Sequence, residues 1–276
     1  MQEAGGFSGV VTHPIPGREG KPRERGLTMV IDKGSSVSET RQLVELAGDY
    51  IDLFKLAFGT SLLYSETMLK AKIELLVANQ IEVYPGGTLL EIAFYQGRIR
   101  EFLNRCLRLG FTAIEVSEGT LDMTPVTRRE IVRMAVDLGF RVLTEVGKKD
   151  SRLRLSNARL EEQIASDLAD GAYKVIIEGR DSGRGVGIYD QAGNIIDQEL
   201  ERVLHAARGI DHIIWEAPMG SQQKDLLRRF GPRVNLGNVQ VNEVIALEAM
   251  RCGLRSDTFA TVLEASTAAV VEEGTS

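Results

Sequence analysis

From about residue 26 to residue 260, the chain alternates between two patterns of apolar residues. Short runs rich in β-branched and aliphatic residues are typical of buried strands. Each run is followed by a longer segment whose apolar residues recur at intervals of three and four, as on one face of a helix. The expected strands are Leu27–Asp32, Tyr50–Leu56, Glu82–Tyr84, Ala113–Ser117, Arg141–Glu145, Tyr173–Glu178, His212–Glu216 and Val234–Leu236.

The helical segments complete eight strand–helix units. The clearest lie near Glu39–Ala47, Glu66–Ala78, Arg98–Leu109, Arg128–Leu138, Leu160–Asp170, Asp197–Ala207, Lys224–Phe230 and Glu243–Cys252. An uninterrupted βα series predicts either a (β/α)8 TIM barrel or an open doubly wound sheet. The barrel is favoured because there are eight units and no Gly-x-Gly-x-x-Gly follows the first strand.

Both ends of the chain differ from this series in composition. Residues 1–25 are rich in glycine, proline and charge, which predicts a flexible leader. Residues 261–276 are expected to form a flexible C-terminal tail, with an apolar AAVV run that could extend a helix. No linker interrupts residues 26–260, so one barrel domain is expected.

Composition narrows the class of partner. The formal net charge of -6 argues against nucleic acid or an anionic membrane as partner, because both favour a basic face. No apolar run is long enough to cross a membrane and no signal peptide is evident, which predicts a cytoplasmic protein. Cys106 and Cys252 both fall in expected helices, where buried thiols are the simplest interpretation. Small molecules are the expected partners.

Four consecutive strands, the fourth to the seventh, end in glutamate. These residues are Glu115, Glu145, Glu178 and Glu216. In a barrel the active site lies at the carboxyl ends of the strands, and equivalent strand positions point the same way. Such a ring of carboxylates needs cations among them. Either Mg2+ or neighbouring basic side chains would serve.

Basic residues also follow several strands. Lys55 lies inside an otherwise apolar strand, where an unpaired charge is costly, so it is expected to reach into the site. Lys33 follows the first strand. Lys148 and Lys149 follow the fifth, and one of them could donate a proton to a substrate carbon, unless both are simply solvated.

Two segments are suited to anions. The glycine-rich stretch 179–187 carries Arg180 and Arg184, and arginine binds phosphate or carboxylate with two hydrogen bonds. Gly237 and Asn238 follow the eighth expected strand, where many barrels bind phosphate. The rim thus predicts a site for a phosphorylated carboxylic acid.

Residue types that are missing from the strand ends also matter. The histidines, His13, His205 and His212, lie in the leader, on a helix and at a strand start, which weakens serine–histidine and histidine–zinc mechanisms. Trp215 alternates with Glu216, so its ring is expected to face the helices.

The rim motifs together resemble the phosphosulfolactate synthase family over about residues 26–260. The matching runs, in order, are GLTMVIDKG, GDYIDLFKLAFGTS, VYPGGTL, LGFTAIEVSEG, VLTEVGKK, VIIEGRDSGRGVGIYD, WEAPMGSQQ and GLRSDTF. The resemblance implies a Mg2+-dependent lyase that adds sulfite to phosphoenolpyruvate to give (2R)-2-O-phospho-3-sulfolactate. In archaeal members this reaction opens coenzyme M biosynthesis.

The resemblance also implies roles for individual residues. Sulfite would attack the methylene carbon, Mg2+ would stabilise the resulting aci-carboxylate, and Lys149, with Lys148 second, would protonate the carbon bearing phosphate. The implied metal ligands are Glu115, Glu145 and Glu178. The implied substrate and catalytic contacts are Lys33, Lys55, Arg180, Arg184, Gly237 and Asn238.

Two other functions remain open at this point. The chain could be another enzyme that enolises the carboxylate of a phosphorylated acid. It could instead be a non-catalytic, stress-associated barrel, since fold alone does not fix function. A homo-oligomer is expected in either case.

Overall fold

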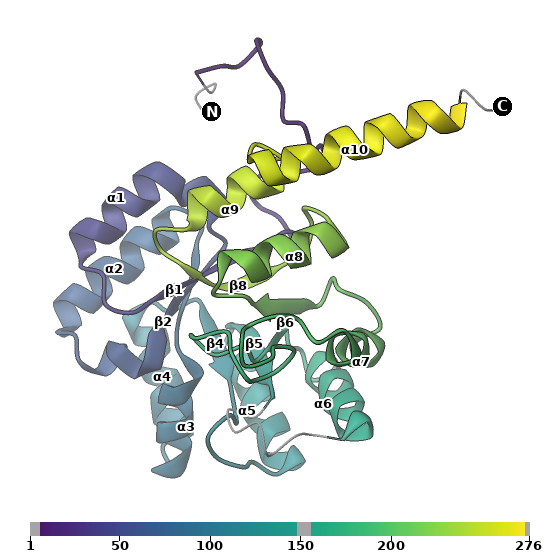
Figure 1. The fold of residues 1–276 in the computed structure, drawn as a ribbon. Coiled ribbons are helices and arrows are strands. Elements are labelled where there is room, and N and C mark those ends of the chain that lie inside the picture. Colours follow the sequence, from purple (N-terminus) through teal and green to yellow (C-terminus); the bar gives the residue numbers. More distant parts are fainter. Residues whose placement is uncertain (1–5, 148–155, 274–276) are drawn as a thin grey trace.

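The computed structural model describes residues 6–147 and 156–273. Eight parallel strands form a barrel (Figure 1). They are β1 (Thr28–Asp32), β2 (Leu53–Leu56), β3 (Glu82–Pro85), β4 (Ala113–Val116), β5 (Arg141–Val146), β6 (Lys174–Ile177), β7 (Ile213–Glu216) and β8 (Leu236–Gln240). Strand β1 pairs with both β2 and β8, so the two halves of the chain meet there. The predicted TIM barrel is confirmed.

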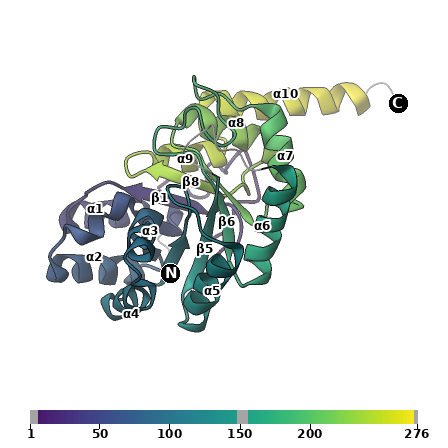
Figure 2. The ribbon, with the colours of Figure 1, turned by 90° about the horizontal axis from the view of Figure 1, so that it is seen from below.

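Helices surround the strands (Figure 2). They are α1 (Val37–Ala47), α2 (Glu66–Ala78), α3 (Gly87–Tyr95), α4 (Ile99–Leu109), α5 (Pro125–Asp137), α6 (Asn157–Ala169), α7 (Asp197–Ala207), α8 (Gly220–Phe230), α9 (Val244–Arg251) and α10 (Ser256–Glu273). Two 3-10 helices, η1 (Gly48–Tyr50) and η2 (Ala57–Leu62), flank β2. Helix α10 extends away from the barrel (Figure 1). No helix in the described part of the chain is long and apolar enough to span a membrane.

Strand residues alternate between two apolar cores. The outward-facing ones pack against the helices, and Trp215 is among them, stacked on Phe230 of α8 at 6.2 Å between ring centroids, as predicted. The inward-facing ones fill the barrel: Leu27, Met29, Leu53, Tyr84, Ala113, Leu143, Ile176 and Ile214. Side chains alternate along a strand, so the next inward-facing residues lie above this interior core, at the carboxyl ends of the strands.

One prediction about β8 is wrong. The strand was expected to end at Leu236, which would leave Gly237 and Asn238 in a loop, but it runs from Leu236 to Gln240. Glycine and asparagine have low strand propensity, so the sequence pattern does not indicate that the strand continues through them. Gly237 is required by packing, since a Cβ atom there would lie 2.4 Å from Met29 Cε and 3.0 Å from Ile214 Cγ2.

The barrel is closed in a different way between β3 and β4 than between its other neighbouring strands. These strands stand at the two ends of the hydrogen-bonded order, so no continuous ladder links them. Thr112 bridges the gap: its backbone N–H donates to Val83 O at 3.1 Å, and its hydroxyl accepts from Val83 N at 3.0 Å.

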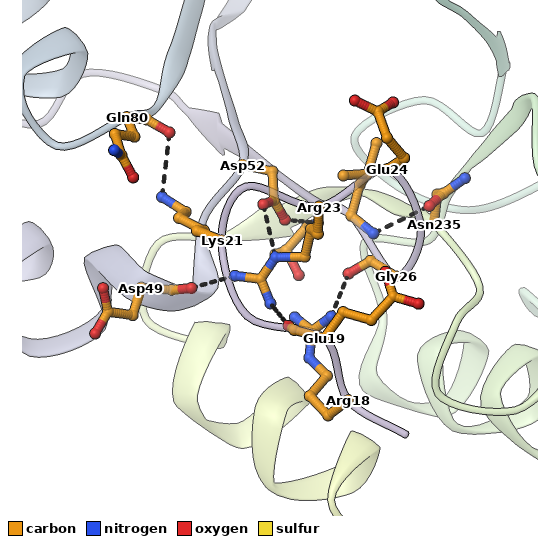
Figure 3. A network of polar contacts seen from close by, with 12 residues as sticks. Arg18, Glu19, Lys21, Arg23, Glu24, Gly26, Asp49, Asp52, Gln80 and Asn235 are labelled. Carbon is orange, nitrogen blue, oxygen red and sulfur yellow. Dashed lines mark hydrogen bonds and ion pairs between the residues drawn. The ribbon is translucent and has the colours of Figure 1, made fainter. Parts of the chain in front are cut away.

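Part of the expected leader packs on the amino-terminal end of the barrel (Figure 3). Arg23 forms a buried ion pair with Asp52, just before β2, with Nε 2.9 Å from Oδ1. Arg18 pairs with Glu248 of α9 at 2.7 Å. Residues 18–23 thus join elements from opposite ends of the chain.

Lys21 completes this amino-terminal network. Its ammonium donates to the backbone carbonyls of Gly48, Asn79 and Gln80, at 2.7, 3.3 and 3.3 Å. Figure 3 shows it between the ends of two helices. Burial lowers the pKa of Lys21 to about 8, against the attraction of Asp52.

Candidate active site

A cavity of about 220 Å³ opens at the carboxyl ends of the strands. Its lining is strongly polar and, among the described residues, carries more acids than bases. The lining residues are Ile31, Lys55, Ala57, Phe58, Gly86, Gly87, Thr88, Glu115, Glu145, Glu178, Arg180, Asp181, Glu216 and Asn238. All four predicted strand-end glutamates are present, and each is buried.

Lys55 stands at the centre of these carboxylates. Its Nζ lies 2.9 Å from Glu115 Oε2, 3.2 Å from Glu216 Oε1 and 3.6 Å from Glu145 Oε2. Burial lowers the pKa of Lys55, but the attraction of the three carboxylates outweighs it and raises the pKa well above its usual value. Lys55 is therefore held as a cation among the three carboxylates.

Three of the glutamates form a cluster suited to a metal ion. One carboxylate oxygen each from Glu145, Glu178 and Glu216 lies within 4.8 Å of the others. Backbone N–H groups hold two of them: Gly179 donates to Glu216 Oε2 at 2.9 Å, and Arg180 donates to Glu178 Oε1 at 2.6 Å. Carboxylates in this arrangement match the hard oxygen ligands that Mg2+ takes in proteins.

Glu115 makes different contacts from those of the three glutamates in this cluster. It accepts a hydrogen bond at 2.9 Å from the backbone N–H of Gly87, the first residue of α3, and pairs with Lys55. Burial raises its pKa to about 7, opposed by Lys55 and assisted by repulsion from Glu145 and Glu216. Glu115 therefore belongs to the Lys55 group, while Glu216 completes the carboxylate cluster.

Arg180, next to Glu178, and Asn238 bring N–H donors suited to an anion into the cavity. Arg180 lines the cavity, and Asn238 donates from Nδ2 to Arg180 O at 3.2 Å. The Oδ1 atom of Asn238 is buried without a hydrogen-bond partner among the described residues. Phe58, Arg180 and Asn238 all have φ between 53° and 58°, a region that non-glycine residues rarely adopt. Such strained residues gather at functional sites.

Comparison with known proteins identifies the family of this chain. The model of the family (2R)-phospho-3-sulfolactate synthase (ComA) matches residues 16–257. A phosphosulfolactate synthase of Methanothermobacter thermautotrophicus is 42% identical over 250 residues, covering 90% of this chain and 96% of its own. The chain belongs to the phosphosulfolactate synthase family. It is therefore an enzyme of a family of lyases that form a carbon–sulfur bond.

Other proteins resemble this phosphosulfolactate synthase family member at lower sequence identity. A phosphosulfolactate synthase of Bacillus subtilis is 39% identical, covering 89% of this chain and 96% of its own. Protein HEAT-STRESS-ASSOCIATED 32 of Arabidopsis thaliana is 22% identical, covering 85% and 88%. The structure of 3-hexulose-6-phosphate synthase from Salmonella typhimurium aligns with a TM-score of 0.53 at 17% identity, covering 86% and 98%, and shows the fold alone.

The remaining predicted site residues lie at the rim of the cavity, on the exposed surface, in the barrel interior or outside the described residues. Lys33 lies at the rim, where its ammonium is 3.3 Å from Asp181 Oδ2. Arg184 is exposed and does not line the cavity. Gly237 faces the barrel interior. Lys148 and Lys149 lie outside the described residues.

Two polar residues beside the cavity were missed from the sequence. Glu91 lies on α3, within the apolar run TLLEIAFY, and Ser117 follows β4. Both are buried and hydrogen-bonded to each other. A charged residue inside an apolar run is the signal that indicates a site role for Lys55, and Glu91 carries the same signal within α3.

Proposed function

We propose that this chain joins sulfite to phosphoenolpyruvate and releases (2R)-2-O-phospho-3-sulfolactate. The proposal rests above all on the cluster of Glu145, Glu178 and Glu216 beside the fixed cation Lys55, in a chain of this family. Small anionic substrates with a divalent cation fit a cavity whose acids outnumber its bases among the described residues.

The reaction balances without a redox partner. A lone pair on sulfite sulfur forms the carbon–sulfur bond at the methylene carbon of phosphoenolpyruvate. The double-bond electrons move toward the substrate carboxylate, giving the aci form, and one proton then adds to the carbon that bears phosphate. Mg2+ bound by Glu145, Glu178 and Glu216 would supply positive charge where negative charge develops.

The protein's own residues have separate tasks in this proposal. Lys55 balances the negative charge of Glu115 and Glu216 and holds their two carboxylates in position. Arg180 and the side-chain NH2 group of Asn238 donate to substrate oxyanions. Because Lys55 is held as a cation by three carboxylates, the proton comes from another group, which we assign to Lys149 with Lys148 second.

Self-association is part of the proposal as well. Leu62, Leu63 and Tyr95 are 74%, 82% and 85% exposed. Large apolar side chains exposed to this degree on η2, α3 and the segment between them are typical of an interface between subunits.

Purified protein mixed with phosphoenolpyruvate, sulfite and Mg2+ tests the reaction directly. We expect phosphosulfolactate, identified by mass spectrometry, only when all three components are present. Absence of product under conditions where phosphoenolpyruvate and Mg2+ still raise the melting temperature would redirect the proposal to another nucleophile. Absence of both product and stabilisation would favour the alternative of a non-catalytic, stress-associated barrel, and one relative of this chain is named for heat stress.

A further inference from the structure

Glu91 lies outside the cavity, yet only 3% of it is exposed. Its Oε2 atom accepts hydrogen bonds from the backbone N–H groups of Thr120, at 2.9 Å, and Leu121, at 3.2 Å. Its Oε1 atom lies 2.9 Å from the hydroxyl oxygen of Ser117. Glu91 therefore ties α3 to the segment that follows β4, and none of the steps proposed above employs it.

Ser117 continues this connection into the site. Its side chain is fully buried, and its one hydroxyl hydrogen can be donated to Glu145 Oε1, which lies 2.9 Å from Oγ. The backbone N–H of Gly119 fixes the same Oγ atom at 3.3 Å. The other oxygen of Glu145, Oε2, lies 3.6 Å from Lys55 Nζ. The two oxygens of Glu145 are thus oriented by separate contacts.

We infer that Glu91 is a positioning residue: acting through Ser117, it fixes the orientation in which Glu145 joins Glu178 and Glu216 around a divalent cation. This inference rests on the metal site of the proposed function. Without an external contact, mutual repulsion would turn the Glu145 carboxylate away from its two neighbours. Groups that hydrogen-bond to metal-binding side chains typically change metal affinity about 10- to 100-fold.

The chemistry of Glu91 decides which substitution tests its role. Its Oε2 atom accepts from the two backbone N–H groups, and its Oε1 atom lies against Ser117 Oγ. Glutamine keeps an oxygen for the two backbone N–H groups and places an NH2 donor toward Ser117 Oγ, so the hydroxyl hydrogen can still point to Glu145. Glu91→Leu removes all of these contacts while keeping a side chain of similar volume, and Glu91→Gln is its conservative control.

The test measures Mn2+ affinity of the full chain by electron paramagnetic resonance, without substrates. Mn2+ serves as the probe because it prefers the same oxygen ligands as Mg2+. We expect Ser117→Ala and Glu91→Leu to weaken Mn2+ binding about 10- to 100-fold, whereas Glu91→Gln should stay within about threefold of the wild type. Ser117→Thr keeps the hydroxyl and should stay within about threefold of the wild type.

Two control variants lose similar groups elsewhere. Thr40→Ala removes a buried hydroxyl that donates to Ser36 O in α1 at 2.8 Å, and Glu248→Gln alters a buried carboxylate at the other end of the barrel. Both should leave Mn2+ affinity unchanged, even if they lower the melting temperature.

The outcomes separate the inference from the proposed function. Wild-type affinity in folded Ser117→Ala and Glu91→Leu would overturn the inference and leave the metal site standing. A wild-type chain that binds no Mn2+ would overturn both. If Ser117→Ala does not fold, Glu91→Leu decides alone, with Glu91→Gln and Glu248→Gln as its controls, and unchanged affinity there rejects the positioning role.

Discussion

Replacing Lys55 by methionine tests whether this ammonium holds the site together. Methionine preserves most of the volume of the side chain and removes its charge. The ammonium lies 2.9 to 3.6 Å from three buried carboxylates. Each attraction amounts to roughly 5 kcal/mol at an effective dielectric constant of ~20, and burial of the ammonium offsets several kcal/mol of the total.

The net effect follows from what the variant leaves behind. Removing one partner of a buried ion pair typically costs about 3–5 kcal/mol, because the other charge stays buried. Three carboxylates would remain here, so we expect Lys55→Met to lower the free energy of unfolding by about 4 kcal/mol at pH 8. That is a large part of the roughly 5–15 kcal/mol that stabilises a typical domain.

The loss should depend on pH in a definite direction. The pKa of Glu115 is already about 7, above its usual 4.5, and without Lys55 it rises further. A carboxyl whose pKa is higher in the folded state contributes stability below pH 4.5, and this contribution is lost as the pH rises through the folded-state value. The deficit of Lys55→Met should therefore be smallest near pH 5 and largest above pH 8.

Equilibrium urea unfolding at both pH values measures this difference. Lys33→Met is the matched control: its side chain is 40% exposed and pairs with Asp181 at the rim, so a change below about 1 kcal/mol is expected. An unfolding free energy for Lys55→Met within about 1 kcal/mol of the wild type at pH 8, or a deficit that grows toward pH 5, would refute the reasoning.

Three further predictions concern other parts of the chain. Deleting residues 1–12 should leave the melting temperature within about 2 °C of the wild type, whereas deleting residues 1–25 strands two buried carboxylates and should lower it by roughly 10 °C in a thermal scan. Gly87→Ala places a Cβ atom 2.5 Å from a Glu115 oxygen and should cost about 1–3 kcal/mol in the same scan, while Gly220→Ala, with open space around it, should cost little. Lys149→Ala should abolish turnover in the product assay with an unchanged circular dichroism spectrum; full activity would reject the assignment of the proton donor.

Much of the fold could be predicted because its pattern is local. The helix Glu66–Ala78 was placed with its observed ends, because its apolar residues recur at helical spacing. Helix α3 was missed because its residues are apolar nearly all round and it begins at a glycine. Nothing in its pattern distinguishes it from a loop followed by a buried strand.

The site could be predicted only as a set of residues at strand ends. Alternation brought all four glutamates to one cavity, but their grouping depends on three-dimensional neighbours. Glu115 faces the start of α3, which donates the Gly87 N–H, and this leaves Glu216 to join Glu145 and Glu178. Because α3 was not predicted, the sequence alone could not separate these two groups.

The gap between β3 and β4 has a consequence for how such an enzyme can change. Lys55 stands on β2 and Glu115 on β4, so their ion pair spans the place where the ring lacks a continuous ladder. The charges that shape the cavity therefore also help to close the barrel. A substitution of either residue that adapts the cavity to a new substrate is therefore expected to weaken the closure between β3 and β4 as well. A second change that strengthens the contacts there, beyond the bridge made by Thr112, would offset this loss.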